Sequence, residues 1–411
     1  MLLAHKIELR TTATQGEYFR RCCGVGRFVF NQLVAKLKSG EKYNRKAFQK
    51  FCSTLRQATP WMREVSSRAV YEAADNFHAA VTNFFRSCKK DVGKKWKPPI
   101  FKKRGRNDNC RFSHSTQFTT NGRSLRVGGL NEQIRMRERI RFEGKVKSVT
   151  IKPYCGKWYA SFLVEMEEKP KPDLTQKPSA GIDFGLKSLA VLSNGEVIEN
   201  PKPLKRSLKK LKRRQRQVSR RYVKGAKQQS RRYTKVVAAV ARIHKKVADQ
   251  RSAAQHKFTS DVVKRFSRIT IEDLNVSGML KNRWLSRAIS DASWCSLRWM
   301  LEYKAKMAGV ELVVADRWFA SSKMCSGCGH KVEKLSLSQR KFHCLECNLS
   351  LDRDLNAAVN LDRYKTTSGP IRTRRKTDRV GLCKTTSVAE PFEPVNINPT
   401  RKNEGRYQLH L

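Results

Sequence analysis

Two pairs of cysteines in the last quarter of the chain have the spacing of a metal site. The four residues are Cys325, Cys328, Cys344 and Cys347. Each pair encloses two residues and 15 residues separate the pairs, which suits a tetrahedral zinc ion with sulfur ligands at about 2.3 Å. His330 and His343 lie close enough in the sequence to be rival ligands. Because four protein ligands leave no position for a substrate, we predict a structural zinc ion.

Three acidic residues stand where carboxylates would be needed to cleave phosphodiesters. That chemistry uses several carboxylates that converge on two Mg²⁺ ions roughly 3.5–4 Å apart. Asp183 ends or follows an expected strand that starts at Ala180, and Glu272 lies near the end of an apolar strand over 269–274. Asp354 begins an expected helix after the second cysteine pair. A single aspartate after a strand is more often a cap or turn residue, so these positions are candidates at this point.

The choice of Asp354 over its neighbour Asp352 follows from helical spacing. The residues expected to share one helical face with Asp354 are Ala357, Ala358 and Leu361. Since alanines permit close packing, Asp354 is expected to point at a sheet and Asp352 to cap the helix. Asp273 is expected to face the side of its strand opposite to Glu272, although a strand end can twist.

The elements that must position these residues belong to a very basic chain of 411 residues, with 87 Lys and Arg against 35 Asp and Glu and a net charge of +52. A compact protein with that excess repels itself unless a polyanion neutralises part of it. No run of 18 apolar residues is present, and the first ten residues lack a signal peptide's apolar stretch. We therefore predict a nucleic-acid partner and no membrane. The remaining cysteines are scattered, which favours a reducing cytoplasm.

Hydrophobic patterning divides the chain into segments. Amphipathic helical stretches continue to about residue 90, and β-branched, alternating strands occupy 110–167. A second α/β segment follows, with strands at 180, 268–273 and 310–315 and helices at 292–308 and 353–364. Beyond residue 365 the chain is polar, so a disordered tail is expected over 366–411.

Two basic segments are expected to contact phosphates. Residues 201–247 contain 19 Lys or Arg and no acid, and an apolar stripe predicts a helical hairpin over 204–265. Residues 89–106 interleave cations with prolines and with Trp96 and Phe101. A solvated basic face and a solvated linker are the alternatives.

Several motifs, in order, resemble the TnpB/OrfB proteins encoded by transposons. Three match the family's RuvC motifs, Gly181–Ala190, Ile271–Val276 and Asp352–Ala358. Others match stretches between them and near the N-terminus, Gly26–Asn31, Asn83–Arg86, Ser290–Trp294, Leu301–Lys304 and Ser322–Gly329. The resemblance covers about residues 1–365.

The resemblance implies an α+β multidomain fold. It implies a β-barrel wedge domain over 1–15 and 107–172, and a helical recognition insertion over 16–106. It further implies an RNase H-like (RuvC) nuclease domain over 173–318 and 349–365, with the four-cysteine zinc element over 319–348.

The implied activity is that of an RNA-guided, Mg²⁺-dependent DNA endonuclease encoded by an insertion-sequence transposon. Such an enzyme cleaves double-stranded DNA beside a short adjacent motif, guided by an RNA made from the transposon end. Matched residue by residue, the catalytic, magnesium-binding carboxylates are Asp183, Glu272 and Asp354. The implied location is the prokaryotic cytoplasm, in association with the nucleoid.

The chain departs from the family pattern in two places. Thr11-Thr12 replaces the usual Tyr-Pro turn, which bears on contacts to the adjacent motif, and Asn348 replaces a glycine after the last cysteine. Since Asn tolerates the left-handed conformation better than most residues, the knuckle is expected to survive.

Three rival functions share parts of this pattern. An RNA-guided DNA-binding transcriptional regulator without cleavage would be expected to lose at least one of the three acids, and all are present. A transposase, or accessory transposition protein, that joins strands itself would need a His-x-His motif with a suitably placed Tyr, which the chain lacks. A type V CRISPR effector is a close relative that genomic context would distinguish.

Overall fold

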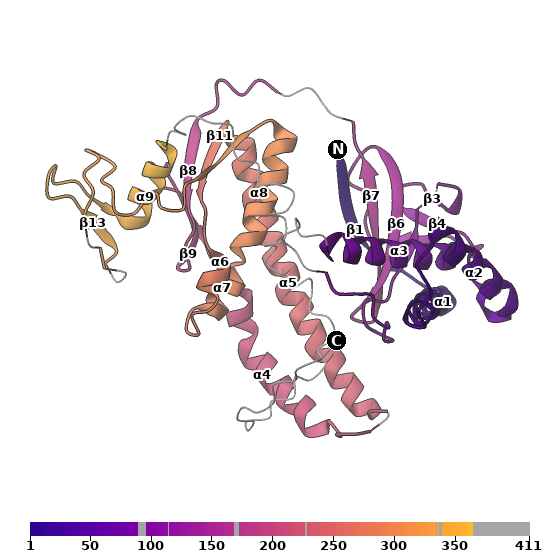
Figure 1. The fold of residues 1–411 in the computed structure, drawn as a ribbon. Helices are drawn as coiled ribbons and strands as arrows, with labels where there is room; N and C mark the ends of the chain where they lie inside the picture. The colour runs from indigo at the N-terminus through magenta and orange to yellow at the C-terminus, as the bar shows by residue number, and fades with distance from the viewer. Residues whose placement is uncertain are drawn as a thin grey trace.

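The computed structural model describes residues 1–88, 96–113, 115–167, 172–226, 228–333, 335–336 and 339–364. The predicted disordered tail, 366–411, lies outside the described residues. Figure 1 shows one sheet in the N-terminal part of the chain and a second sheet in the C-terminal part, each covered by helices. Within the described ranges we find no helix with the length and apolar character needed to cross a membrane.

The first sheet has seven strands in the order β2-β6-β7-β1-β5-β4-β3, and every neighbouring pair is antiparallel. The strands are β1 (Leu2–Arg10), β2 (Cys110–Phe112), β3 (Phe118–Thr120), β4 (Ser124–Val127), β5 (Ile134–Met136), β6 (Lys145–Tyr154) and β7 (Lys157–Glu165). A short 3-10 helix, η2 (Ser115–Gln117), contacts both β3 and β6, so the sheet curls until it is nearly a barrel. Alternating residues of β1, such as Ile7 and Leu9, enter its core.

Three helices share a hydrophobic core with this sheet: α1 (Ala13–Lys38), α2 (Arg45–Ala58) and α3 (Arg68–Cys88), with a 3-10 turn, η1 (Pro60–Glu64), between the last two. Thr12 begins α1 with a capping box, because its side chain accepts from the Gln15 N–H while the Gln15 side chain accepts from the Thr12 N–H. The departure from the family's turn at Thr11-Thr12 therefore creates a helix cap.

The second sheet is mixed, with the order β10-β9-β8-β11-β12. Its strands are β8 (Ser179–Asp183), β9 (Ser188–Leu192), β10 (Val197–Glu199), β11 (Arg268–Glu272) and β12 (Glu311–Ala315). β8 pairs antiparallel with β9, but β8, β11 and β12 run parallel. The carboxyl ends of those three strands therefore meet at one edge, although more than 80 residues separate β8 from β11 along the chain.

Helices cover both faces of this sheet: α9 lies on one side and α5 and α8 lie on the other (Figure 1). The helices of this part are α4 (Pro203–Arg221), α5 (Arg231–Arg265), α6 (Val276–Met279), α7 (Ser286–Ala292), α8 (Trp294–Ala308) and α9 (Arg353–Asp362). A two-stranded hairpin, β13 (Lys341–His343) and β14 (Ser350–Asp352), precedes α9. The expected helical hairpin is confirmed as α4 and α5, with Leu211, Val240 and Ile243 in their shared core.

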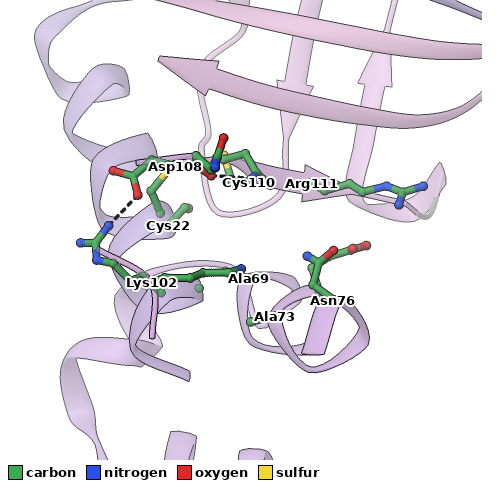
Figure 2. A pocket seen from close by; sticks show the side chains of 14 residues that line it. Cys22, Ala69, Ala73, Asn76, Lys102, Asp108, Cys110 and Arg111 are labelled. Atoms are coloured by element: carbon green, nitrogen blue, oxygen red, sulfur yellow. Dashed lines mark hydrogen bonds and ion pairs between the residues drawn. The ribbon is translucent and has the colours of Figure 1, made fainter. Parts of the chain in front are cut away.

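Of the basic linker expected to contact phosphates, residues 89–95 lie outside the described residues, and the part around Lys102 is held against α1. The Asn31 side chain donates to the Lys102 carbonyl at 3.1 Å and accepts from the Lys102 N–H at 2.7 Å. The Lys102 ammonium lies 3.8 Å from the centre of the Phe30 ring, and burial lowers its pKa. This lysine lines a pocket with Cys22, Asp108 and others between α1, α3 and β2 (Figure 2). Lys102 is thus half-buried, whereas Lys103 and Arg104 are exposed.

Candidate functional site

Two of the three candidate carboxylates lie side by side at the parallel edge of the second sheet. Ile182 of β8 is paired with Ile271 of β11, so Asp183 and Glu272 are the next residues on adjacent strands. The two carboxylates therefore lie at the same edge of the sheet, although 89 positions separate the two residues in the sequence.

The third carboxylate, that of Asp354, lies on α9, which packs directly on β8. Asp352 caps this helix, because its side chain accepts from the N–H groups of Asp354 and Leu355 at 2.9 and 3.3 Å. The expected inner face is confirmed, since Ala357, Ala358 and Leu361 are buried. Asp354 lies on the first turn of this helix, and Asp352 has the capping role that helical spacing predicted.

A glycine makes this close approach possible. A Cβ at Gly181 of β8 would collide with backbone atoms of Ala358 and Asp362 on α9. A larger residue at this position would push α9, and Asp354 with it, away from the sheet. The Gly181 N–H also donates to Ser193, whose hydroxyl donates to Asp362 at 3.0 Å.

The three carboxylates act on one another electrostatically. Burial raises the pKa of Asp183 well above its usual value, and the negative charges of Glu272 and Asp354 raise it further. We call Asp183, Glu272 and Asp354 the acidic edge. Three carboxylates that repel one another favour a bound cation, and their hard oxygens fit a divalent metal ion.

Asp273 has a different role from its neighbour Glu272. Arg298 of α8 and Arg317 both donate to its carboxylate. Burial alone would raise the pKa of Asp273, but these two guanidinium groups outweigh burial and lower it. Asp273 therefore joins α8 and the segment after β12 to the end of β11.

Three polar residues that the sequence did not single out support the acidic edge. Ser321 donates a hydrogen bond to the Glu272 carboxylate. On α9, the buried Asn360 donates to the carbonyls of Ser321 and Met324, and the buried Asn356 donates to Met324 and accepts from the Ser326 N–H at 2.9 Å. In the sequence, the signal that could have identified the two asparagines is their spacing of one helical turn beside the alanine face of α9.

The four cysteines form one cluster, as predicted. Their sulfur atoms all lie within 4.8 Å of one another. Cys325 and Cys347 are 3.5 Å apart and Cys328 and Cys344 are 3.6 Å apart, close to the separation of about 3.8 Å expected for sulfurs 2.3 Å from a tetrahedral ion. Among the residues that the structure describes, no other group of metal-ligating side chains is gathered this tightly.

Local geometry also suits a metal-binding knuckle. Burial would raise the pKa of the Cys325 thiol, but backbone N–H groups of Cys328 and Gly327 and the neighbouring cysteines lower it to about 7. Asn348 has a φ of 57°, the left-handed conformation expected where the family has glycine. The rival ligands are outside the cluster, with His343 exposed on β13 and His330 3.9 Å from Glu346. The cysteines could thus bind zinc.

Helix α4 presents a basic surface, whereas α5 pairs several of its cations, such as Lys245 with Asp249 and Arg251 with Asp291. The exposed cations of α4 are Lys205, Arg206, Lys209, Lys210, Lys212, Arg213, Arg216, Arg220 and Arg221. Within the described ranges, none of them forms an ion pair with an acidic side chain. Helix α4 therefore carries its charge outward, where it can meet an external polyanion.

Fold and site together define a basic α+β protein with a four-cysteine cluster that is connected through α9 to an acidic sheet edge. Family models match three segments: OrfB of IS605, described as "Probable transposase", at 161–283; the Cas12f1-like TNB domain at 294–361; and a helix-turn-helix domain of the same OrfB group at 1–46. A solved cryo-EM structure of a Cas12f1–sgRNA–target DNA complex contains a chain with 15% identity and a TM-score of 0.34, over 88% of this chain and 99% of that one.

Two relatives match across most of their length. A Streptomyces pristinaespiralis protein, provisionally named an RNA-guided DNA endonuclease, is 35% identical over 87% of this chain and 88% of its own. InsQ of Escherichia coli K12, provisionally named likewise, is 31% identical over 88% of this chain and 91% of its own. The chain belongs to the OrfB/TnpB family, which confirms the resemblance in its motifs.

Proposed function

We propose that this protein is an RNA-guided, Mg²⁺-dependent DNA endonuclease of an insertion-sequence transposon. The observation that carries the proposal is the acidic edge, three mutually repelling carboxylates at the meeting point of two parallel strands and a helix. The names of the two long relatives agree with this activity. The guide would be an RNA from the transposon end, and the target would be double-stranded DNA beside a short adjacent motif.

In this proposal the second sheet is an RNase H-like (RuvC) domain over 173–318 and 349–365. The near-barrel sheet is a wedge domain over 1–15 and 107–172, residues 16–106 are a helical recognition insertion, and 319–348 form a zinc element. The mixed strand order with helices on both faces supports the first assignment, and the seven-stranded curled sheet supports the second.

The residues of the acidic edge would hold two Mg²⁺ ions, which supply an activated water and stabilise the leaving oxygen when bound. Asp183 and Glu272 approach from the strands and Asp354 from α9, so an ion between them would be held from two directions. The Ser321 hydrogen bond orients Glu272. The cysteine cluster would bind a structural zinc ion and hold α9 through Asn356 and Asn360.

The first test compares two acids within one helical turn. Protein co-expressed with RNA from its own locus is incubated with Mg²⁺ and a target library. We expect wild type to cut guide-matched sites that share one flanking motif, and Asp354→Asn to lose at least 100-fold in rate. Asp352→Asn keeps a good helix cap, so it should retain cleavage. RNA-dependent binding without cutting by wild type would refute the nuclease and favour an RNA-guided regulator.

A further inference from the structure

Trp318 is an exposed aromatic side chain next to the acidic edge. Its side chain is 86% exposed in the segment between β12 and the first cysteine pair. Leaving a large apolar ring in water forgoes the stabilisation that burial would provide. The ring therefore needs an explanation that folding does not supply.

The segment around Trp318 has a defined conformation that turns this ring outward. The Asp316 side chain accepts from the Trp318 N–H at 2.8 Å, and the Asp316 carbonyl accepts from the Phe319 N–H at 3.0 Å. The next aromatic residue, Phe319, packs inward edge-to-face on Tyr364, with ring centres 4.8 Å apart. Two consecutive residues thus carry a half-buried ring and an exposed one.

The segment is attached to the end of β11 on both sides of Trp318. On one side, Arg317 donates to the Asp273 carboxylate at 2.6 Å. On the other side, Ser321 donates to Glu272 of the acidic edge. These two contacts hold the exposed ring beside the carboxylates.

The chemistry of the surroundings identifies what such a ring would bind. The chain has a net charge of +52, although Arg317, which directly precedes the ring, is itself paired with Asp273. Exposed aromatic rings on basic proteins bind unpaired bases, since every base offers a π-face for stacking. A base within a duplex is already stacked on both sides, so the ring selects a single strand.

We propose that Trp318 stacks on a base of the DNA strand that enters the acidic edge, next to the phosphate to be cut. This inference rests on the proposed function and adds the residue that holds a base of the unpaired strand. Trp318 is a substrate-binding residue in this scheme. The acidic edge performs the chemistry.

The experiment measures binding apart from cleavage, in the Asp183→Ala background. The whole chain, with and without its guide RNA, is titrated with a single-stranded oligodeoxynucleotide containing 2-aminopurine. Adding Trp318→Ala should weaken binding at least fivefold and remove the quenching of 2-aminopurine, whereas Trp318→Phe should keep most of both. Trp299→Ala is the matched control, because Trp299 on α8 is 60% exposed and its ring packs at a tilt against Tyr303 of the same helix.

Thermal melting and zinc content should be unchanged in Trp318→Ala, because the ring is exposed. Equal DNA binding with and without Trp318, or no binding in either case, overturns the inference. So does a loss confined to single-stranded RNA of the same sequence. Since the readout needs no cleavage, a positive result stands even if the chain does not cut. Equal cutting by wild type and Trp318→Ala would overturn only the stacking role.

Discussion

At the scale of single residues, the site depends on residues that lower the stability of the folded protein. Asp183 is partly buried beside two other carboxylates, and a glycine precedes it by two positions so that α9 can approach. Such arrangements are typical of functional sites, where stability is sacrificed for binding. The acidic edge should therefore destabilise the protein when no cation is bound.

The first prediction concerns Asp183→Asn in buffer without Mg²⁺. Because the folded protein raises the pKa of Asp183, the folded state binds more protons than the unfolded state between about pH 4 and that raised value. Stability from this group therefore falls as pH rises through the window. At pH 8, Asp183→Asn should have a free energy of unfolding about 1 kcal/mol larger than that of wild type, which raises its melting temperature by about 2–4 °C. Below pH 4, its melting temperature should be no higher than that of wild type.

Addition of Mg²⁺ should then raise the melting temperature of wild type more than that of Asp183→Asn, because only wild type has the full set of carboxylates. Differential scanning calorimetry over this pH range measures both effects. A variant that melts lower than wild type at pH 8 without Mg²⁺ would contradict the account of like-charge repulsion at the acidic edge.

At the scale of elements, the cysteine cluster and α9 form one cooperative unit. Asn356 and Asn360 of α9 hydrogen-bond to the backbone of Met324, directly before the first cysteine of the cluster. The same helix carries Asp354. A metal ion in the cluster is therefore connected to the acidic edge through backbone contacts, without being part of it.

The second prediction is that zinc loss loosens α9. Cys344→Ser should bind less than one zinc ion per chain and should increase hydrogen exchange in residues 353–362, because the contacts of Asn356 and Asn360 lose their support. Cys88→Ser is the control, since Cys88 is exposed on α3 outside the cluster. Unchanged exchange in α9 after complete zinc removal would disprove the coupling.

At the scale of the whole molecule, charge is the dominant feature. A net charge of +52 is distributed over both parts of the chain, and α4 presents many cations outward with no acidic partner among the described residues. Binding to a polyanion releases condensed counterions, so affinity falls as salt rises. In the proposed function, guide RNA and target DNA are the two polyanions that share this charge.

The third prediction assigns part of that salt dependence to α4. Replacing Lys209, Lys210 and Arg213 with Gln should make the slope of log affinity against log salt shallower by about 2–3, if each contacts a phosphate. The charge-preserving swaps Lys209→Arg, Lys210→Arg and Arg213→Lys should keep the slope. Filter binding of the guide RNA at several salt concentrations measures it. Equal slopes for the Gln variant and wild type would place the phosphate contacts elsewhere.

The sequence by itself determined the features that depend on near neighbours in the chain. Alternation and helical periodicity predicted most strands and helices, the α4–α5 hairpin, the Asp352 cap and the inner alanine face of α9. The spacing of the cysteines predicted their cluster, and the family motifs predicted the family. These features are local or are carried by short motifs, so no long-range contact was needed to find them.

Only the tertiary structure decided how distant segments meet. The parallel register of β8 and β11 places Asp183 beside Glu272, and the two arginines that hold Asp273 come from other elements. The linker lysine Lys102 is half-buried, with its backbone held by Asn31 of α1. The exposure of Trp318 likewise depends on tertiary contacts, because Arg317 and Ser321 attach its segment to the end of β11. Sheet register and side-chain packing join residues far apart in sequence, and local periodicity carries no information about those pairings.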